Sequence, residues 1–194
     1  MEIVEDNYMT KDKHIIFNDT NIKLADNTFV MMDWEAELMS LHAKLVTQNK
    51  GHILEIGFGM GISSQAIQDC GCDTHTIVES HPQVLEKLKE WALDKPNVNI
   101  IEGDWFESLS KISDKDYDGI FYDADCSNMK NFKKLVVDKY LKEGGIFTYF
   151  EPKGKDIYNY EDLLVLYLIE IETEIPKNQY HNDQHCFCPY IINV

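Results

Sequence analysis

The segment His52-Ile53-Leu54-Glu55-Ile56-Gly57-Phe58-Gly59-Met60-Gly61-Ile62-Ser63-Ser64 decides the fold of this chain. A short apolar run, typical of a buried strand, ends in three glycines at alternate positions and then opens a helix with small polar residues. A second apolar run, Thr76-Ile77-Val78-Glu79, ends in an acid. Glycines let the backbone turn sharply and approach a ligand, and a carboxylate at this strand end can accept hydrogen bonds from ribose hydroxyls. The two segments together predict a nucleotide-type cofactor site.

The glycine spacing argues against a dinucleotide. The pattern is G-x-G-x-G rather than G-x-G-x-x-G, and Glu55 stands two places before the first glycine. A carboxylate there would repel a pyrophosphate, but it could face a positively charged ligand. We therefore expect a ligand with cationic character at this turn.

The charge of the chain limits its partners. There are 34 acidic and 18 basic residues among 194, all the basic ones are lysines, and the net charge is −16. Nucleic acid binding depends largely on basic contacts and commonly on arginine, so we expect no nucleic acid partner. A cationic substrate is easier to accommodate, although a high charge also serves solubility.

The length and the apolar pattern indicate one domain outside the membrane. A chain of this size with 44% hydrophobic residues forms a single core. No apolar run approaches the roughly 18 residues that span a bilayer, and the first residues lack the features of a signal peptide. We expect a cytoplasmic protein without a membrane partner, with residues 1–30 as an N-terminal extension and 31–194 as the core.

From residue 52 to residue 150, strand and helix patterns alternate. Strands are expected at 52–56, 76–79, 98–101, 117–122 and 146–150, and helices at 34–47, 62–68, 82–93 and 131–140. Asp33 is the expected N-cap of the first helix, and Gly144-Gly145 an expected turn. Residues 169–175 and 186–193 follow without room for a crossover helix. The pattern predicts an α/β fold: a mostly parallel, seven-stranded sheet that ends in an antiparallel hairpin, with a short strand pair at 15–17 and 22–24.

Ligands of such sheets lie beyond the carboxyl ends of the strands. We therefore expect the chemistry near five places at those ends: Gly57, Glu79, Gly103-Asp104, Asp123 and Glu151. Cysteine and histidine also gather at 181–188, but the alternation of residues 186–193 favours a strand there. We accordingly predict no metal site.

Two motifs carry a family resemblance. The pattern E-x-G-x-G-x-G with the distal Glu79 resembles motif I of class I S-adenosylmethionine-dependent methyltransferases, which have a Rossmann-like sheet. The segment Val30-Met31-Met32-Asp33-Trp34-Glu35, followed by Met39, resembles guanidinoacetate N-methyltransferase and the fungal type IV (δ-nitrogen) protein arginine methyltransferase. The likeness continues through VESHP, EGDWFE and DGIFYDAD and covers most of residues 17–150.

The resemblance implies S-adenosylmethionine as the cofactor and a guanidino compound as the substrate. By it, Glu35 and Asp123 hold the guanidinium. It also implies a cofactor contact set, namely Met31, Met39, Phe58, Gly59, Met60, Gly61, Ile62, Ser63, Glu79, Ser80, His81, Gly103 and Asp104. The substrate stays open among free arginine, guanidinoacetate and a peptide arginine, and the oligomeric state stays open too, a homodimer included.

Guanidino chemistry needs such a carboxylate pair. A guanidinium has a pKa above about 12 and no free lone pair, so its nitrogen must lose a proton as it attacks a methyl group. Two carboxylates bind it in a bidentate manner and localise its charge on the other nitrogens. One of them, which we expect to be Asp123, accepts the proton.

Two other hypotheses remain. Asp123-Ala124-Asp125 is similar to the Asp-Ala-Asp motif of metal-dependent catechol-type O-methyltransferases, but Glu151 stands where that family has the second half of its metal site. Alternatively, the chain binds the cofactor without catalysis and assists another methyltransferase. That role would not need both Glu35 and Asp123.

The chain also departs from the guanidino family in its substrate pocket. Ala124-Asp125 replaces a stretch that begins with threonine, and residues 150–155 differ from the loop that holds the substrate carboxylate in guanidinoacetate methyltransferases. Lys153 could pair with a substrate carboxylate in that loop. Tyr8 is a candidate for a lid over the site.

Overall fold

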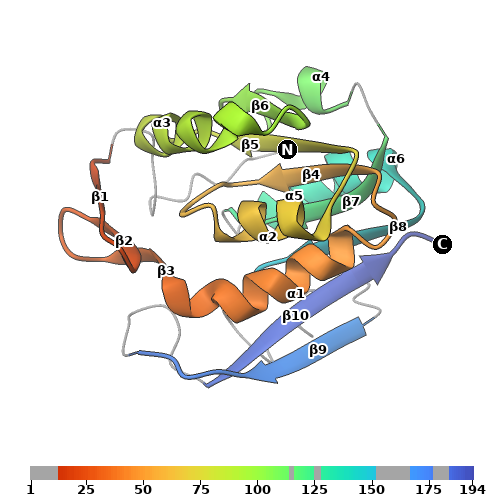
Figure 1. Ribbon diagram of the computed structural model, residues 1–194. Coiled ribbons are helices and arrows are strands. Elements are labelled where there is room, and N and C mark those ends of the chain that lie inside the picture. Colours follow the sequence, from red (N-terminus) through yellow and green to blue (C-terminus); the bar gives the residue numbers. More distant parts are fainter. Residues whose placement is uncertain (1–12, 114–115, 125–127, 152–166, 177–183) are drawn as a thin grey trace.

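The computed structural model describes residues 13–113, 116–124, 128–151, 167–176 and 184–194. Its main feature is a seven-stranded sheet with the strand order β6-β5-β4-β7-β8-β10-β9 (Figure 1). The strands are β4 (His52–Ile56), β5 (Thr74–Glu79), β6 (Val98–Glu102), β7 (Tyr117–Tyr122), β8 (Leu141–Tyr149), β9 (Tyr167–Glu172) and β10 (His185–Ile192). The pairs from β6 to β8 are parallel, and β10 is antiparallel to both β8 and β9. The predicted parallel sheet and terminal hairpin are confirmed.

Helices cover both faces of this sheet (Figure 1). One face carries α1 (Ala36–Val46), α2 (Ile62–Cys70) and α3 (Pro82–Trp91), which pack in two apolar clusters around Ile53 and Ile77. The other face carries α4 (Leu109–Ile112), α5 (Met129–Phe132), the π-helix Lys133–Val137 and α6 (Asp138–Tyr140). Because successive strand residues point to opposite faces, Glu55, Phe121 and Asp123 belong to the α1 side.

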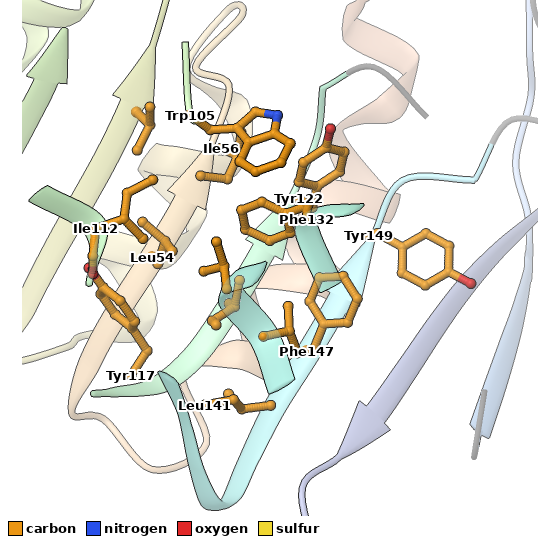
Figure 2. Close-up of a cluster of buried hydrophobic side chains, with 14 of the residues drawn as sticks. Leu54, Ile56, Trp105, Ile112, Tyr117, Tyr122, Phe132, Leu141, Phe147 and Tyr149 are labelled. Atoms are coloured by element: carbon orange, nitrogen blue, oxygen red, sulfur yellow. The ribbon is translucent and has the colours of Figure 1, made fainter. Parts of the chain in front are cut away.

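The opposite face holds an aromatic core (Figure 2). The ring of Phe132 from α5 packs against Trp105 and Tyr122, with ring centroids 5.2 and 4.6 Å away. Each buried aromatic side chain stabilises the fold by roughly 1.5–3 kcal/mol. This packing fixes the end of β7, where Asp123 follows.

A second, three-stranded sheet lies beside the main one: β1 (Ile15–Phe17), β2 (Asn21–Leu24) and β3 (Phe29–Met32). The pair β1–β2 is the one predicted, and β3 is an addition. The Gln83 side chain of α3 bonds the backbone of Ile15 at both N–H and C=O, which ties this sheet to the main body. Residue 30 lies inside β3, and the expected division of the chain there remains a prediction.

Two local predictions are wrong. Asp33 does not cap α1, because the 3₁₀ turn Asp33–Glu35 precedes the helix and Glu35 takes the N-cap position; the backbone N–H of Asp33 bonds Thr20 O. Gly144-Gly145 does not form a turn before the strand but lies inside β8, which begins at Leu141. Gly144 has φ +74°, a value that glycine adopts without strain, and its N–H reaches Asn193 O, so the strand continues through an irregular step.

Candidate active site

The glycine turn after β4 forms a tight backbone cradle. Gly57, Gly59 and Gly61 all have positive φ, at 91°, 54° and 75°. A Cβ on Gly57 would lie 2.2 Å from the Asp123 carbonyl oxygen, and one on Gly59 would lie 2.5 Å from the Met31 sulfur. The turn therefore requires glycine both for its conformation and for these close approaches.

Glu79 holds this turn in place from the end of β5. One carboxylate oxygen accepts the N–H of Phe58 at 2.9 Å, and the other accepts those of Ser80 and His81 at 2.7 Å each. The Glu79 carbonyl accepts the N–H of Gly103 at 2.9 Å, which brings the end of β6 to the same place. Glu79 thus joins three of the segments that the sequence assigned to the cofactor, two through its carboxylate and the third through its backbone carbonyl.

The two methionines of the predicted site lie on either side of Glu35 in the chain. Met31, on β3, reaches the glycine turn, where its sulfur accepts the N–H of Met60 at 3.2 Å. Met39 is fully buried on α1, in the cluster that also contains Trp34. The Ile62 side chain, at the first position of α2, packs against this cluster as well.

Glu55 does not face a ligand as we expected. Its carboxylate is fully buried and accepts the hydroxyls of Ser63 and Ser64 at 2.5 Å each, and Nε2 of His75 lies 2.9 Å away. Strand alternation turns its side chain under α2 instead of beyond the strand end. Ser64 and His75 thereby join the support of the glycine turn, a role that no motif in the sequence marked. Ser63, a member of the predicted cofactor set, therefore donates its hydroxyl hydrogen bond to Glu55.

Asp104 stabilises the turn that follows β6 by accepting hydrogen bonds from the backbone of that turn. Its carboxylate accepts the N–H of Phe106 at 2.8 Å, and its carbonyl accepts the N–H of Ser108 at 3.0 Å. Gly103 before it has φ +123°, a backbone conformation that L side chains rarely adopt. The glycine at this position is therefore required by the backbone conformation of the turn, since an added Cβ would meet only the Ser108 hydroxyl at an ordinary 3.4 Å.

Glu35 and Asp123 lie at the same end of the α1 side of the sheet. Glu35 is only 3% exposed, and one of its carboxylate oxygens accepts the N–H of Met32 at 2.9 Å. Asp123 directly follows β7 and is half-buried, with its N–H on Ile56 O at 2.9 Å.

Asp123 lies in a strongly negative environment. Burial raises its pKa well above the ordinary value, and three nearby carboxylates raise the pKa further: Glu35, Glu55 and Glu79. Negative charge is therefore costly at Asp123 unless a cation is bound. Such a group is suited to hold a cation and then to take a proton from it.

Several of the predicted residues lie outside the described part of the chain. Tyr8 and Lys153 lie outside the described residues, as does Asp125 of the Asp-Ala-Asp motif. Glu151 follows β8 and is 2% exposed. Within the described ranges, no three His, Cys, Asp or Glu residues form a group that could hold a metal ion, and no helix is long and apolar enough to cross a bilayer.

Solved structures with a similar fold include spermidine synthase from Thermotoga maritima. It aligns with a TM-score of 0.65 and 16% identity, over 91% of this chain and 67% of that one. The N-methyltransferase NodS from Bradyrhizobium japonicum, in complex with S-adenosyl-L-homocysteine, aligns with a TM-score of 0.60 and 15% identity, over 82% and 87% of the two chains. At these identities the likeness shows the fold alone, which is that of class I methyltransferases.

Sequence comparison gives closer relatives. Protein arginine N-methyltransferase 2 of Kluyveromyces lactis is 41% identical over 138 residues, which are 66% of this chain and 34% of the relative. The protein of that name from Saccharomyces cerevisiae is 38% identical over the same length, with the same coverage. The chain thus spans about a third of the length of these curated relatives. A family model described as guanidinoacetate N-methyltransferase matches residues 5–179, so the chain belongs to the guanidinoacetate N-methyltransferase family.

Proposed function

We propose that this protein is an S-adenosylmethionine-dependent N-methyltransferase that acts on a guanidino group. The observation that carries the proposal is the placement of Glu35, just before α1, near Asp123, whose backbone packs against Gly57 of the glycine cradle. The membership of the family and the names of the yeast relatives support the same chemistry.

The positive φ values of Gly57, Gly59 and Gly61 and the absence of side chains on them leave the backbone of this turn open to close approach, which supports a cofactor site there. The residues that would hold S-adenosylmethionine are those of the predicted set around this turn and Glu79. The Glu79 oxygen that accepts the N–H of Phe58 has a further lone pair, which can accept a hydrogen bond from a ribose hydroxyl. When bound, the cofactor supplies an electrophilic methyl group on a cationic sulfur.

The carboxylate pair performs the binding and proton steps. Met32 N–H fixes one oxygen of Glu35, so this side chain presents its remaining lone pairs in a set orientation. A bound guanidinium lies between Glu35 and Asp123 and relieves their mutual repulsion, which lowers the pKa of Asp123 and leaves it ionised. As the nitrogen attacks, Asp123 accepts its proton. Burial raises the pKa of Asp123 and so acts against this lowering, which keeps the carboxylate more basic than it would be beside the same cation at the surface.

The substrate class is guanidino, and within it we propose a peptide arginine, free arginine or guanidinoacetate. The test is product analysis by mass spectrometry after the protein is incubated with S-adenosylmethionine and each compound. A methyl group on a guanidino nitrogen of one of them is the expected product. Products methylated only on a hydroxyl or on another atom would overturn the proposal.

A further inference from the structure

Helix α1 lies along β7 in a defined register. At one end, a Cβ on Gly119 would lie 2.1 Å from the Val46 carbonyl oxygen, so the helix backbone touches the strand there. In the middle, the His42 ring stacks on Phe121 with centroids 4.8 Å apart and an interplanar angle of 25°. Gly119, Phe121 and Asp123 alternate along the strand and therefore point to this same helix.

This register determines how Glu35 faces Asp123. Glu35 directly precedes α1, about two helical turns from His42, and Asp123 lies two residues beyond Phe121 along the strand. A helix rises about 1.5 Å per residue and a strand about 3.3 Å, so a slip of one residue in the His42 contact moves Glu35 past Asp123 by more than an ångström. The contact at His42 thus fixes the separation between Glu35 and Asp123.

The contact of His42 with the sheet is polar and buried, although the rest of the interface between α1 and the sheet is apolar. Nδ1 of His42 lies 2.7 Å from the Thr148 hydroxyl on β8, and Thr148 donates its only proton to Pro189 O on β10 at 2.6 Å. Thr148 therefore accepts the Nδ1–H of His42. The Cys188 sulfur lies 3.1 Å from the same ring nitrogen. Both His42 and Thr148 are fully buried, and burial lowers the pKa of His42 to about 3, so the ring is neutral.

The hydrogen bond between His42 and Thr148 depends on direction, unlike the apolar contacts around it. The neighbours of His42 on the helix, such as Met39 and Ala43, make apolar contacts, which depend little on direction. The Thr148 hydroxyl accepts a hydrogen bond from one fixed point on α1 and is itself bonded to Pro189 O on the neighbouring strand. This hydrogen bond from Nδ1 of His42 to the Thr148 hydroxyl therefore restrains both the rotation and the translation of the helix.

We propose that Thr148, acting through His42, is a positioning residue that sets the separation of the Glu35 and Asp123 carboxylates; this rests on the proposed function. The comparison that tests it uses Thr148→Val, which keeps the shape and removes the hydroxyl, and Thr148→Ser, which keeps the hydroxyl. The matched control is Tyr117→Phe, which removes the buried hydroxyl bond to Ile112 O at the opposite end of β7. Each variant is assayed for guanidino kcat/KM and for the Kd of S-adenosylmethionine.

Thr148→Val should lower guanidino kcat/KM by about 10- to 100-fold, since a misplacement of about 1 Å has effects of that order. The cofactor Kd should stay within about twofold, and Thr148→Ser and Tyr117→Phe should behave like the wild type. A role in stability alone would instead lower the fraction of active protein and leave kcat/KM per active molecule unchanged. Unchanged kcat/KM in folded Thr148→Val, or equal losses in Tyr117→Phe, would overturn the proposal.

A second measurement does not depend on turnover. The titration of the Asp123 carboxyl, followed by carbon-13 NMR, reports the charges that face it, which are Glu35, Glu55 and Glu79. Thr148→Val should displace its midpoint from the wild-type value, and Thr148→Ser and Tyr117→Phe should not. If the wild type methylates no guanidino compound, the proposed function fails, and this titration still decides the positioning role: an unmoved midpoint in Thr148→Val would overturn it.

Discussion

Gly57 packs directly against the backbone of Asp123: a Cβ on Gly57 would lie 2.2 Å from the Asp123 carbonyl oxygen. The N–H of Asp123 bonds Ile56 O at 2.9 Å, just before the glycine. The turn assigned to the cofactor and the carboxylate assigned to the guanidinium are therefore joined by backbone contact. A disturbance of one reaches the other without any side chain between them.

Gly57→Ala should disrupt this junction. The substitution combines a strained φ of +91° with a collision against backbone, which cannot move aside as a side chain can. Gly144→Ala is the matched control, because Gly144 has φ +74° but nothing within 4 Å of an added Cβ. The control should cost about 1–2 kcal/mol from left-handed strain alone. Thermal denaturation should show a clearly larger loss for Gly57→Ala, and equal losses would contradict the close contact.

Glu35→Gln and Asp123→Asn should each abolish methyl transfer while cofactor binding survives. Each variant keeps its shape but loses a charge that holds the guanidinium, and Asp123→Asn also loses the proton acceptor, a contribution of about 10²–10⁴ in rate. Steady-state kinetics and calorimetric titration with S-adenosylmethionine measure the two effects. Glu102→Gln, an exposed carboxylate on β6, is the control. Loss of cofactor affinity with unchanged turnover would reverse the assigned roles.

The rate should depend on pH through Asp123. The pKa of this carboxyl is raised, so protonation blocks guanidinium binding at a pH where an ordinary aspartate, with pKa about 3.9, is still ionised. We expect kcat/KM to rise with pH through a limb well above 4. The limb of kcat should lie lower, because the bound cation lowers the pKa of Asp123. A single limb near pH 4 in both profiles would be inconsistent with the raised pKa.

The same raised pKa makes Asp123 unfavourable for folding. Between the ordinary aspartate pKa and the raised one, the folded protein binds more protons than the unfolded chain, so stability falls as pH rises through this window. Asp123→Asn, which cannot ionise, removes this loss of stability at higher pH. Its stability should match the wild type below about pH 4 and exceed it above the folded pKa, by about 2–4 °C in Tm for each kcal/mol gained. Denaturation scans across this range test the sign; a variant less stable at neutral pH would contradict it.

The sequence predicted the main sheet well, because its signals were local. The apolar run before Gly57, the acid at Glu79 and the consecutive apolar runs at 169–175 and 186–193 each depend on neighbouring residues. Asp33 shows where local reasoning stops. Its residue type favours a cap, but the pairing of β3 with β2 uses its backbone N–H, and this pairing is not visible in the helix sequence.

In the candidate site too, residues within local motifs could be predicted, and contacts between distant segments could not. Motifs placed Glu35, Glu79 and Asp123, and the structure brings them to one end of the sheet. The partners of Glu55 could not be read in that way, because Ser64 and His75 meet it only through the packing of α2 and β5. His42 and Thr148 likewise look like unremarkable residues of a helix and a strand, and they meet across a long separation in sequence.

The most direct test of the guanidino assignment is transfer of a labelled methyl group from S-adenosylmethionine. The acceptors would be an arginine peptide, arginine, guanidinoacetate and a catechol, each with and without a metal chelator. We predict label on a guanidino compound, to the same extent with the chelator. Label on the catechol that the chelator abolishes would make Asp123 a metal ligand and would contradict the account.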